Sequence, residues 1–276
     1  MTCRPSASCA WTRAHRHDDS APTCNLPHEH VGIEVPAWYT CSVTFRDRLL
    51  ATLRAIQPIL DVRGVLVAGS EVPNLLEVDA ATTLVVSQDV DLAIPIAVHE
   101  EVKSRLDQIT RLIPSSDEPS VWVPRPEAAE LIEVNFIGLD PAIVEPRDTY
   151  EKQDARLPLM VFGPLSLLAA GSVVEIDGLR IPLPQPAGLA LEKLVSDRTG
   201  EKGDRDLLVV AGLLTTMTPT DFDQLERAYL GLSIELRHQV RSNLAILSLL
   251  DARPSMPDPR PQRPVVDALS RRLVAR

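Results

Sequence analysis

The spacing of hydrophobic residues divides most of the chain into two regions. In the first, residues 43–184, short apolar runs and alternating segments typical of strands are interspersed with segments of helical periodicity. The second, residues 185–250, carries apolar residues every three or four positions, which is typical of amphipathic helices. The pattern therefore predicts an α/β domain with a mixed sheet and flanking helices, followed by a C-terminal helical domain.

The expected strands are short and rich in β-branched residues. The turn Asp177-Gly178 joins two of them, so we expect a hairpin there. The segment at residues 121–123 is flanked by prolines and is expected at a sheet edge. The predicted strands cover residues 65–68, 82–86, 88–94, 121–123, 131–137, 159–162, 172–176 and 179–183.

Helices are predicted where apolar residues share one helical face. Pro58 stands near the end of the first helix and is expected to close it. The predicted helices cover residues 45–60, 71–76, 98–113, 187–196, 202–214, 220–229 and 233–250. Residues 251–276 form a tail that begins with a linker rich in proline and arginine, and a last, loosely packed helix is expected over residues 265–274.

The first 42 residues differ from the rest, because they contain all four cysteines and four of the six histidines. A zinc site is one interpretation, but there is no Cys-x-x-Cys pair and the spacings fit no common zinc motif. We therefore favour a flexible N-terminal extension. The two remaining histidines, His99 and His238, are isolated in the sequence and are expected on the surfaces of helices.

Composition narrows the classes of function. The formal net charge of −10 argues against a broad basic groove for nucleic acid, although it allows a local basic patch. No apolar run is long enough to span a membrane, and the N-terminus lacks the apolar core of a signal peptide. We expect a cytoplasmic protein with no membrane partner.

The clearest candidate chemistry lies in residues 65–95. Asp89 and Asp91 are separated by one residue, so on a strand both carboxylates project from the same face. Two acids so close repel each other unless a cation neutralises them, and Mg²⁺ prefers carboxylate oxygens. The turn at Gly69 and Ser70, followed by a short helix, could offer backbone N–H groups to phosphates. This stretch predicts a site for a metal ion and a triphosphate.

A third polar position lies on the strand predicted at residues 131–137. Glu133 and Asn135 project from one face of that strand. If it neighbours the strand that carries Asp89 and Asp91, either side chain could complete the metal site.

Together these motifs resemble the signature of the nucleotidyltransferase-fold superfamily, the DNA polymerase β-like group. In that family a strand ends in a Gly-Ser turn, and a later strand carries two acids separated by one residue. Ser87-Gln-Asp-Val-Asp91 looks like the version found in one bacterial branch, which is similar to the toxins of abortive-infection toxin–antitoxin pairs. The downstream segments Leu191-Glu-Lys-Leu194, Arg198 and Lys202-Gly-Asp-Arg-Asp-Leu207 are similar to that branch's Lys-Leu, Arg and Lys-x-x-x-Asp-Leu series.

The resemblance implies a role for each matching residue. Asp89 and Asp91 would hold Mg²⁺ or Mn²⁺, and an acceptor would attack the α-phosphate of an NTP. The residues implied to bind the nucleotide are Gly69, Ser70, Ser87, Lys193, Arg198, Lys202 and Arg205. The acceptor is open between RNA, a protein and a small molecule, and an antitoxin partner is possible. Lys193 has a second interpretation, as a helix residue paired with Glu192 or Asp197.

One position departs from the family pattern. Val134-Asn-Phe-Ile137 matches the context of the third family carboxylate, but the aspartate is replaced by Asn135, with Glu133 as a possible substitute two residues earlier. An amide binds Mg²⁺ more weakly and cannot accept a proton from a hydroxyl. Two alternatives to an active transferase therefore remain: a catalytically weakened nucleotide-binding module, and a toxin–antitoxin interaction protein that acts by contact.

Overall fold

The chain forms two compact units in a computed structural model, Met1–Cys41 and Ser42–Arg276. The structure describes residues of the second unit: 44–76, 89–143, 145, 148–196, 200–253 and 256–274. The predicted N-terminal extension and the strand predicted at residues 82–86 lie outside these ranges. None of the helices in these ranges is both long and apolar enough to cross a bilayer.

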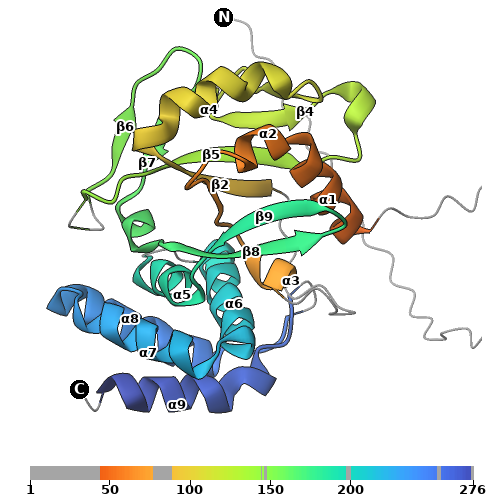
Figure 1. Cartoon of the computed structure of the whole chain (residues 1–276). Helices are drawn as coiled ribbons and strands as arrows, with labels where there is room; N and C mark the ends of the chain where they lie inside the picture. The colour runs from red at the N-terminus through yellow and green to blue at the C-terminus, as the bar shows by residue number, and fades with distance from the viewer. Residues whose placement is uncertain are drawn as a thin grey trace, which may run out of the picture. The chain divides into compact units, whose positions relative to one another are not determined.

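A mixed sheet forms the centre of the second unit (Figure 1). Its two middle strands run parallel, with Asp89 opposite Glu133 and Asp91 opposite Asn135. The remaining neighbours include antiparallel pairs, as expected. The strands are β1 (Leu66–Val67), β2 (Asp89–Pro95), β5 (Glu133–Leu139), β4 (Val121–Pro124) and β3 (Leu112–Pro114) in spatial order, with β7 (Leu159–Val161) beside β5 and β6 (Tyr150–Lys152) beside β7.

Strand β5 is shared by two neighbours along the edge that faces away from β2. β4 pairs with its first half, where Val121 lies opposite Asn135. β7 pairs with its second half, where Met160 lies opposite Ile137. Between them, the backbone N–H of Phe136 donates to the carbonyl of Ser120 at 2.9 Å. The sheet therefore divides next to Asn135.

The two faces of β2 and β5 have different surroundings. Val90, Leu92 and Val134 are fully buried in the core, which also includes residues of the helices α1 (Phe45–Ala55), α2 (Gln57–Leu60) and α4 (His99–Arg105). Figure 1 shows these helices on one side of the sheet and the C-terminal helices on the other. The alternation predicted for the strand at 88–94 is confirmed.

The predicted hairpin is also confirmed. β8 (Ala170–Ile176) and β9 (Leu179–Pro184) pair antiparallel. The turn residues Asp177 and Gly178 have φ angles of 50° and 74°, and a two-residue turn of type I′ requires positive φ at both positions. β9 packs against β1 and so extends the protein beyond that strand.

The C-terminal third is helical, as predicted. The helices are α5 (Pro186–Val195), α6 (Gly200–Thr216), α7 (Pro219–Leu230), α8 (Ile234–Leu249) and α9 (Arg263–Val274). The loose packing expected for the last helix is wrong, because α9 packs on α8 and buries Val266, Leu269 and Leu273.

Several other boundaries differ from the predictions. The helix expected over residues 98–113 is α4 followed by a 3₁₀ turn, Leu106–Gln108, and its last residues belong to β3 instead. The strand at 121–123 is not at an edge, because β4 lies between β5 and β3. The first helix is interrupted at Ile56, and Pro58 lies in the first turn of α2. β6 was not predicted. The short helix α3 (Val72–Leu76) follows the Gly-Ser turn as expected.

Candidate functional site

The two aspartates of β2 and the asparagine of β5 form the centre of the site. The parallel register puts Asn135 beside Asp91. The Asn135 amide nitrogen, Nδ2, donates to Asp89 Oδ2 at 2.8 Å and to Asp91 Oδ1 at 2.9 Å. Both carboxylates therefore face the same point. The sequence analysis left the adjacency of these two strands as a condition, and the structure meets it.

These side chains line a cleft of about 720 Å³ between the sheet and the C-terminal helices. That volume is within the range of sites for small-molecule ligands. The wall formed by the strands and the Gly-Ser turn includes Ala68, Ser70, Asp89, Asp91, Ala93, Ser120, Asn135 and Ile137. The wall formed by α5, α6 and the residue after α5 includes Glu192, Lys193, Ser196, Lys202, Arg205 and Asp206.

The helical wall of the cleft carries three of the predicted cationic residues. Lys193 is buried, with its ammonium 3.0 Å from Glu192 Oε2 and 3.7 Å from Asp206 Oδ1. Burial alone would lower the pKa of Lys193, but the carboxylates of Glu192, Asp206 and Asp91 outweigh it and raise that pKa. Lys193 is therefore charged and paired with Glu192, and it lines the cleft although it is largely buried.

Two further cations, Lys202 and Arg205, lie one turn apart on α6 and are exposed to solvent at the cleft. Residues three apart on a helix lie on the same face. Two positive charges therefore face the cleft from the wall opposite the aspartates.

An acidic residue that the sequence analysis did not single out lies beside the aspartate pair. Glu71 has no solvent exposure, and its Oε1 accepts a hydrogen bond from the backbone N–H of Asp91 at 3.3 Å. Among the described residues, its other oxygen, Oε2, has no hydrogen-bond partner. Burial first, and then the charges of Asp91 and Asp89, raise the pKa of Glu71 well above its usual value. The carboxyl of Glu71 therefore keeps its proton to a higher pH than an ordinary glutamate does.

The position of Glu71 gives Gly69 a role different from the one implied by the resemblance. A Cβ on Gly69 would stand 2.2 Å from Glu71 Oε2, so the glycine makes room for this carboxyl. The sequence does hold a signal that could have identified Glu71 as a candidate site residue. It is the one charged residue directly after the Gly-Ser turn, in a stretch that is otherwise largely apolar.

The predicted site residues fall into three groups. The cleft brings together Ser70, Asp89, Asp91, Asn135, Lys193, Lys202 and Arg205. Gly69 and Glu133 are not among the residues that line it, and Glu133 is exposed to solvent. Ser87 and Arg198 lie outside the described residues.

The aspartate pair fits a divalent metal ion. Burial first, and then the charge of Asp89, raise the pKa of Asp91, and a bound cation would remove both penalties. The donor set is two carboxylates that face one point and an amide whose oxygen and nitrogen exchange places when it rotates. Carboxylate and amide oxygens are ligands that Mg²⁺ and Mn²⁺ accept.

A second group of possible metal ligands was not predicted. His99, Glu100 and Asp154 bring one ligand atom each to within 4.8 Å of one another. His99 follows the other end of β2, so this group lies apart from the aspartates. The expectation that His99 is a surface residue is wrong, because only 1% of it is exposed.

Comparisons with known proteins give few matches. No protein-family model matches the chain, and no curated protein matches it either. One similar solved structure is described as an antigenic nucleotidyltransferase-like protein from Paracoccidioides brasiliensis. It is 15% identical, with a TM-score of 0.48, and the match covers 82% of this chain and 93% of that one. A likeness at this score assigns neither an activity nor a site to this chain.

Proposed function

We propose that this chain is a nucleotidyltransferase of the DNA polymerase β-like superfamily, which uses a divalent metal ion to transfer a nucleoside monophosphate from an NTP to an acceptor hydroxyl. One observation carries the proposal: Asp89 and Asp91 face a common point with Asn135 in a cleft whose opposite wall carries the exposed cations Lys202 and Arg205 beside the paired group Glu192, Lys193 and Asp206. Such a cleft offers a place for a metal ion at one wall and for a polyphosphate at the other.

The residues of the cleft would divide the work of the reaction. Asp89 and Asp91 would hold the metal, which supplies charge stabilisation to the attacking and leaving oxygens. Lys202 and Arg205 would bind the phosphates by charge-assisted hydrogen bonds, and the Ser70 hydroxyl would donate another. The acceptor oxygen forms a bond to the α-phosphorus while the bond to pyrophosphate breaks. The hydroxyl proton leaves to one of the aspartates or to water, because Asn135 cannot accept it.

The experiment that tests the proposal follows the label of each α-³²P-labelled NTP. The full chain is incubated with Mg²⁺ or Mn²⁺ and with total RNA or cell extract as the acceptor source. We expect a labelled product, reduced by about a hundredfold or more in the double variant Asp89→Asn/Asp91→Asn. This variant keeps the shape of both side chains and removes their charge. Unchanged labelling by a folded double variant would refute the mechanism, and no labelled product under any condition would refute transfer.

A second candidate, nucleotide binding without transfer, is favoured by Asn135. Its amide donates to both carboxylates, so the family's third acid is replaced by a neutral group that partly neutralises the other two. Equilibrium dialysis with Mg²⁺ and labelled NTP separates the two candidates: this one predicts binding with no product.

The link to toxin–antitoxin systems rests on the sequence motifs at residues 87–91 and in α5 and α6. RNA is our first choice of acceptor, since exposed cations line the cleft. Sensitivity of the labelled product to ribonuclease or to protease distinguishes RNA from protein. A small antitoxin encoded by a neighbouring gene should bind the chain and suppress labelling.

A further inference from the structure

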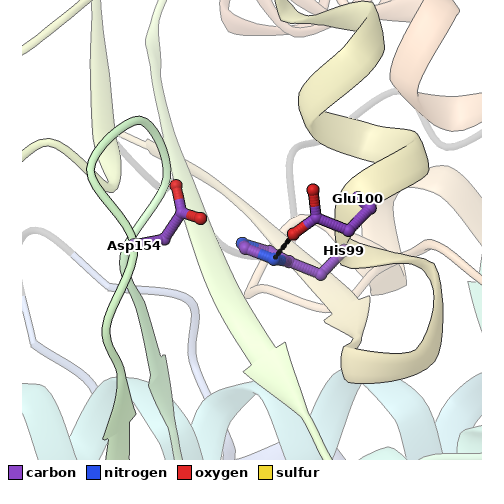
Figure 2. A group of neighbouring side chains, drawn as sticks. All are labelled: His99, Glu100 and Asp154. Atoms are coloured by element: carbon purple, nitrogen blue, oxygen red, sulfur yellow. Dashed lines mark ion pairs between the residues drawn. The ribbon is translucent and has the colours of Figure 1, made fainter.

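We propose that His99, Glu100 and Asp154 form a second metal site, separate from the aspartate pair, which takes a divalent transition-metal cation such as Zn²⁺. Figure 2 shows the three side chains converging from the start of α4 and from the turn between β6 and β7. Their ligand atoms lie within 4.8 Å of one another. One imidazole and two carboxylates form a donor set that suits Zn²⁺ better than Mg²⁺, which prefers oxygen ligands alone.

The orientation of the His99 ring carries the proposal. His99 Nε2 lies 2.8 Å from the carbonyl oxygen of Leu157, which can only accept, so Nε2 bears the hydrogen. The neutral ring then presents a bare lone pair at Nδ1. That atom is buried, has no hydrogen-bond partner in the described part of the chain, and lies 3.5 Å from Glu100 Oε1. Metal-binding histidines show this arrangement, with one nitrogen donating to a carbonyl and the other facing the metal.

His99 Nδ1 is buried, but the Glu100 side chain that it faces is 79% exposed. The two facing lone pairs still repel unless solvent, a proton or a cation lies between them. An imidazolium with its proton between Nδ1 and Glu100 is the alternative occupant. Asp154 favours the metal, because it adds a second carboxylate from a different element. Its Oδ1 accepts the N–H groups of Arg156 and Leu157 at 2.8 and 3.0 Å, so this carboxylate is held in place by its own turn.

Lys103 is the competitor for this site. Its ammonium lies 3.0 Å from both oxygens of Glu100 and 2.6 Å from Asp154 Oδ2. Lys103 has a partly exposed side chain and reaches these carboxylates from the solvent side. It leaves by moving its flexible side chain into solvent, which a divalent cation with two carboxylates and an imidazole can drive. Lys103 therefore sets the metal concentration at which the site fills.

A metal ion bound at this site would link the turn between β6 and β7 to α4 and restrict the motion of both. Asp154 and Leu157 both belong to that turn, and Leu157 already accepts from His99. The experiment therefore measures hydrogen exchange by mass spectrometry in the full chain, with and without Zn²⁺. We expect Zn²⁺ to slow exchange in peptides that cover residues 99–105 and 150–157. This local readout separates the site from the cysteines and histidines of the first 42 residues.

Three variants make the test decisive. Lys103→Met removes the competitor and should lower the half-saturating Zn²⁺ concentration by about tenfold. Asp154→Asn keeps a carbonyl oxygen for the turn and removes the ligand charge, so the Zn²⁺ response should be lost. Glu101→Gln, on the same helix but outside the group, is the matched control and should respond like the parent.

The proposal is overturned if Zn²⁺ changes exchange at neither peptide in both the parent and the Lys103→Met variant, which is the result that an imidazolium predicts. It is equally overturned if Asp154→Asn responds as the parent does. Neither result bears on nucleotide transfer, which is measured by the label and not by exchange at this turn.

Discussion

At the scale of single residues, Asn135 is the position at which the proposed metal site has an amide in place of a third carboxylate. Its replacement by aspartate adds a carboxylate at the point that Asp89 and Asp91 already face. We expect Asn135→Asp to increase the rate of metal-dependent labelling by about ten- to a hundredfold, because the new group binds the cation and can accept a proton. Initial rates with labelled NTP measure the effect.

The same substitution should also make the folded state depend on the metal. Three carboxylates without a cation repel, so Asn135→Asp should lower the Tm in EDTA and show a larger rise in Tm with Mg²⁺ than the parent. Glu133→Gln, at an exposed position outside the cleft, is the control and should leave both rate and Tm nearly unchanged. Equal Mg²⁺ responses of Asn135→Asp and the parent would mean that residue 135 does not face the metal.

The raised pKa of Glu71 predicts that the stability of the folded protein depends on pH. Its raised pKa means that the folded protein keeps a proton which the unfolded chain releases above the usual glutamate value of 4.5. The free energy of unfolding contributed by this group is therefore greatest at low pH and falls as the pH rises towards the raised pKa. Glu71→Gln has no proton to release, so its Tm should gain on the parent's as the pH rises above 4.5.

The measurement is thermal unfolding in EDTA at several pH values, with Glu101→Gln as an exposed control. Parallel pH profiles for Glu71→Gln and the parent would show that Glu71 is ionised in the folded protein. The burial of the Glu71 side chain could not be predicted from the sequence. A glutamate reads as a surface residue, and only the packing of the turn against β2 places this one at zero exposure beside Asp91.

At the scale of elements, the sequence predicts best where one local pattern settles both the type of element and its face. Val90 and Leu92 alternate with Asp89 and Asp91, and the structure buries the former and turns the latter to the cleft. The turn Asp177-Gly178 predicts its hairpin because few residues accept positive φ. Here the side-chain chemistry and the backbone requirement agree.

The elements that the sequence analysis predicted wrongly, or did not predict, have a common cause. Leu112 and Ile113 fit the helical period of the preceding segment, yet they belong to β3 because β4 offers them a partner strand. β6 has three residues without apolar alternation, and it exists through its pairing with β7. The cleft itself depends on which helices pack opposite the aspartates. The hydrophobic periodicity of one segment does not reveal which distant segments it will pair with or pack against.

The last helix gives a prediction at this scale. α9 buries Leu269 against α8 and the rest of the C-terminal helices, so the tail contributes to stability. Leu269→Ala should lower the free energy of unfolding by about 2–5 kcal/mol through lost burial and the cavity left behind. Asp267→Ala, exposed on the same helix, should change it by less than about 0.5 kcal/mol. Urea unfolding measures both, and equal effects would mean that α9 does not pack in solution.

At the scale of the whole molecule, the chain has a negative net charge, yet exposed cations line its cleft. The net charge of −10 repels a polyphosphate at long range, so binding depends on local cations and on the metal. Lys202 and Arg205 face the cleft from α6, opposite the aspartates. The double variant Lys202→Gln/Arg205→Gln should therefore weaken binding of Mg²⁺-NTP by about tenfold or more, and binding should become less sensitive to salt.

The control for this variant removes the same charge elsewhere. Arg125 and Arg227 are exposed and do not line the cleft, so Arg125→Gln/Arg227→Gln changes the net charge equally. If long-range attraction governed binding, both double variants would weaken it to the same extent. If the cleft binds the phosphates directly, only Lys202→Gln/Arg205→Gln weakens binding. Isothermal titration at two salt concentrations distinguishes these cases, and equal losses would remove the cationic wall from the site.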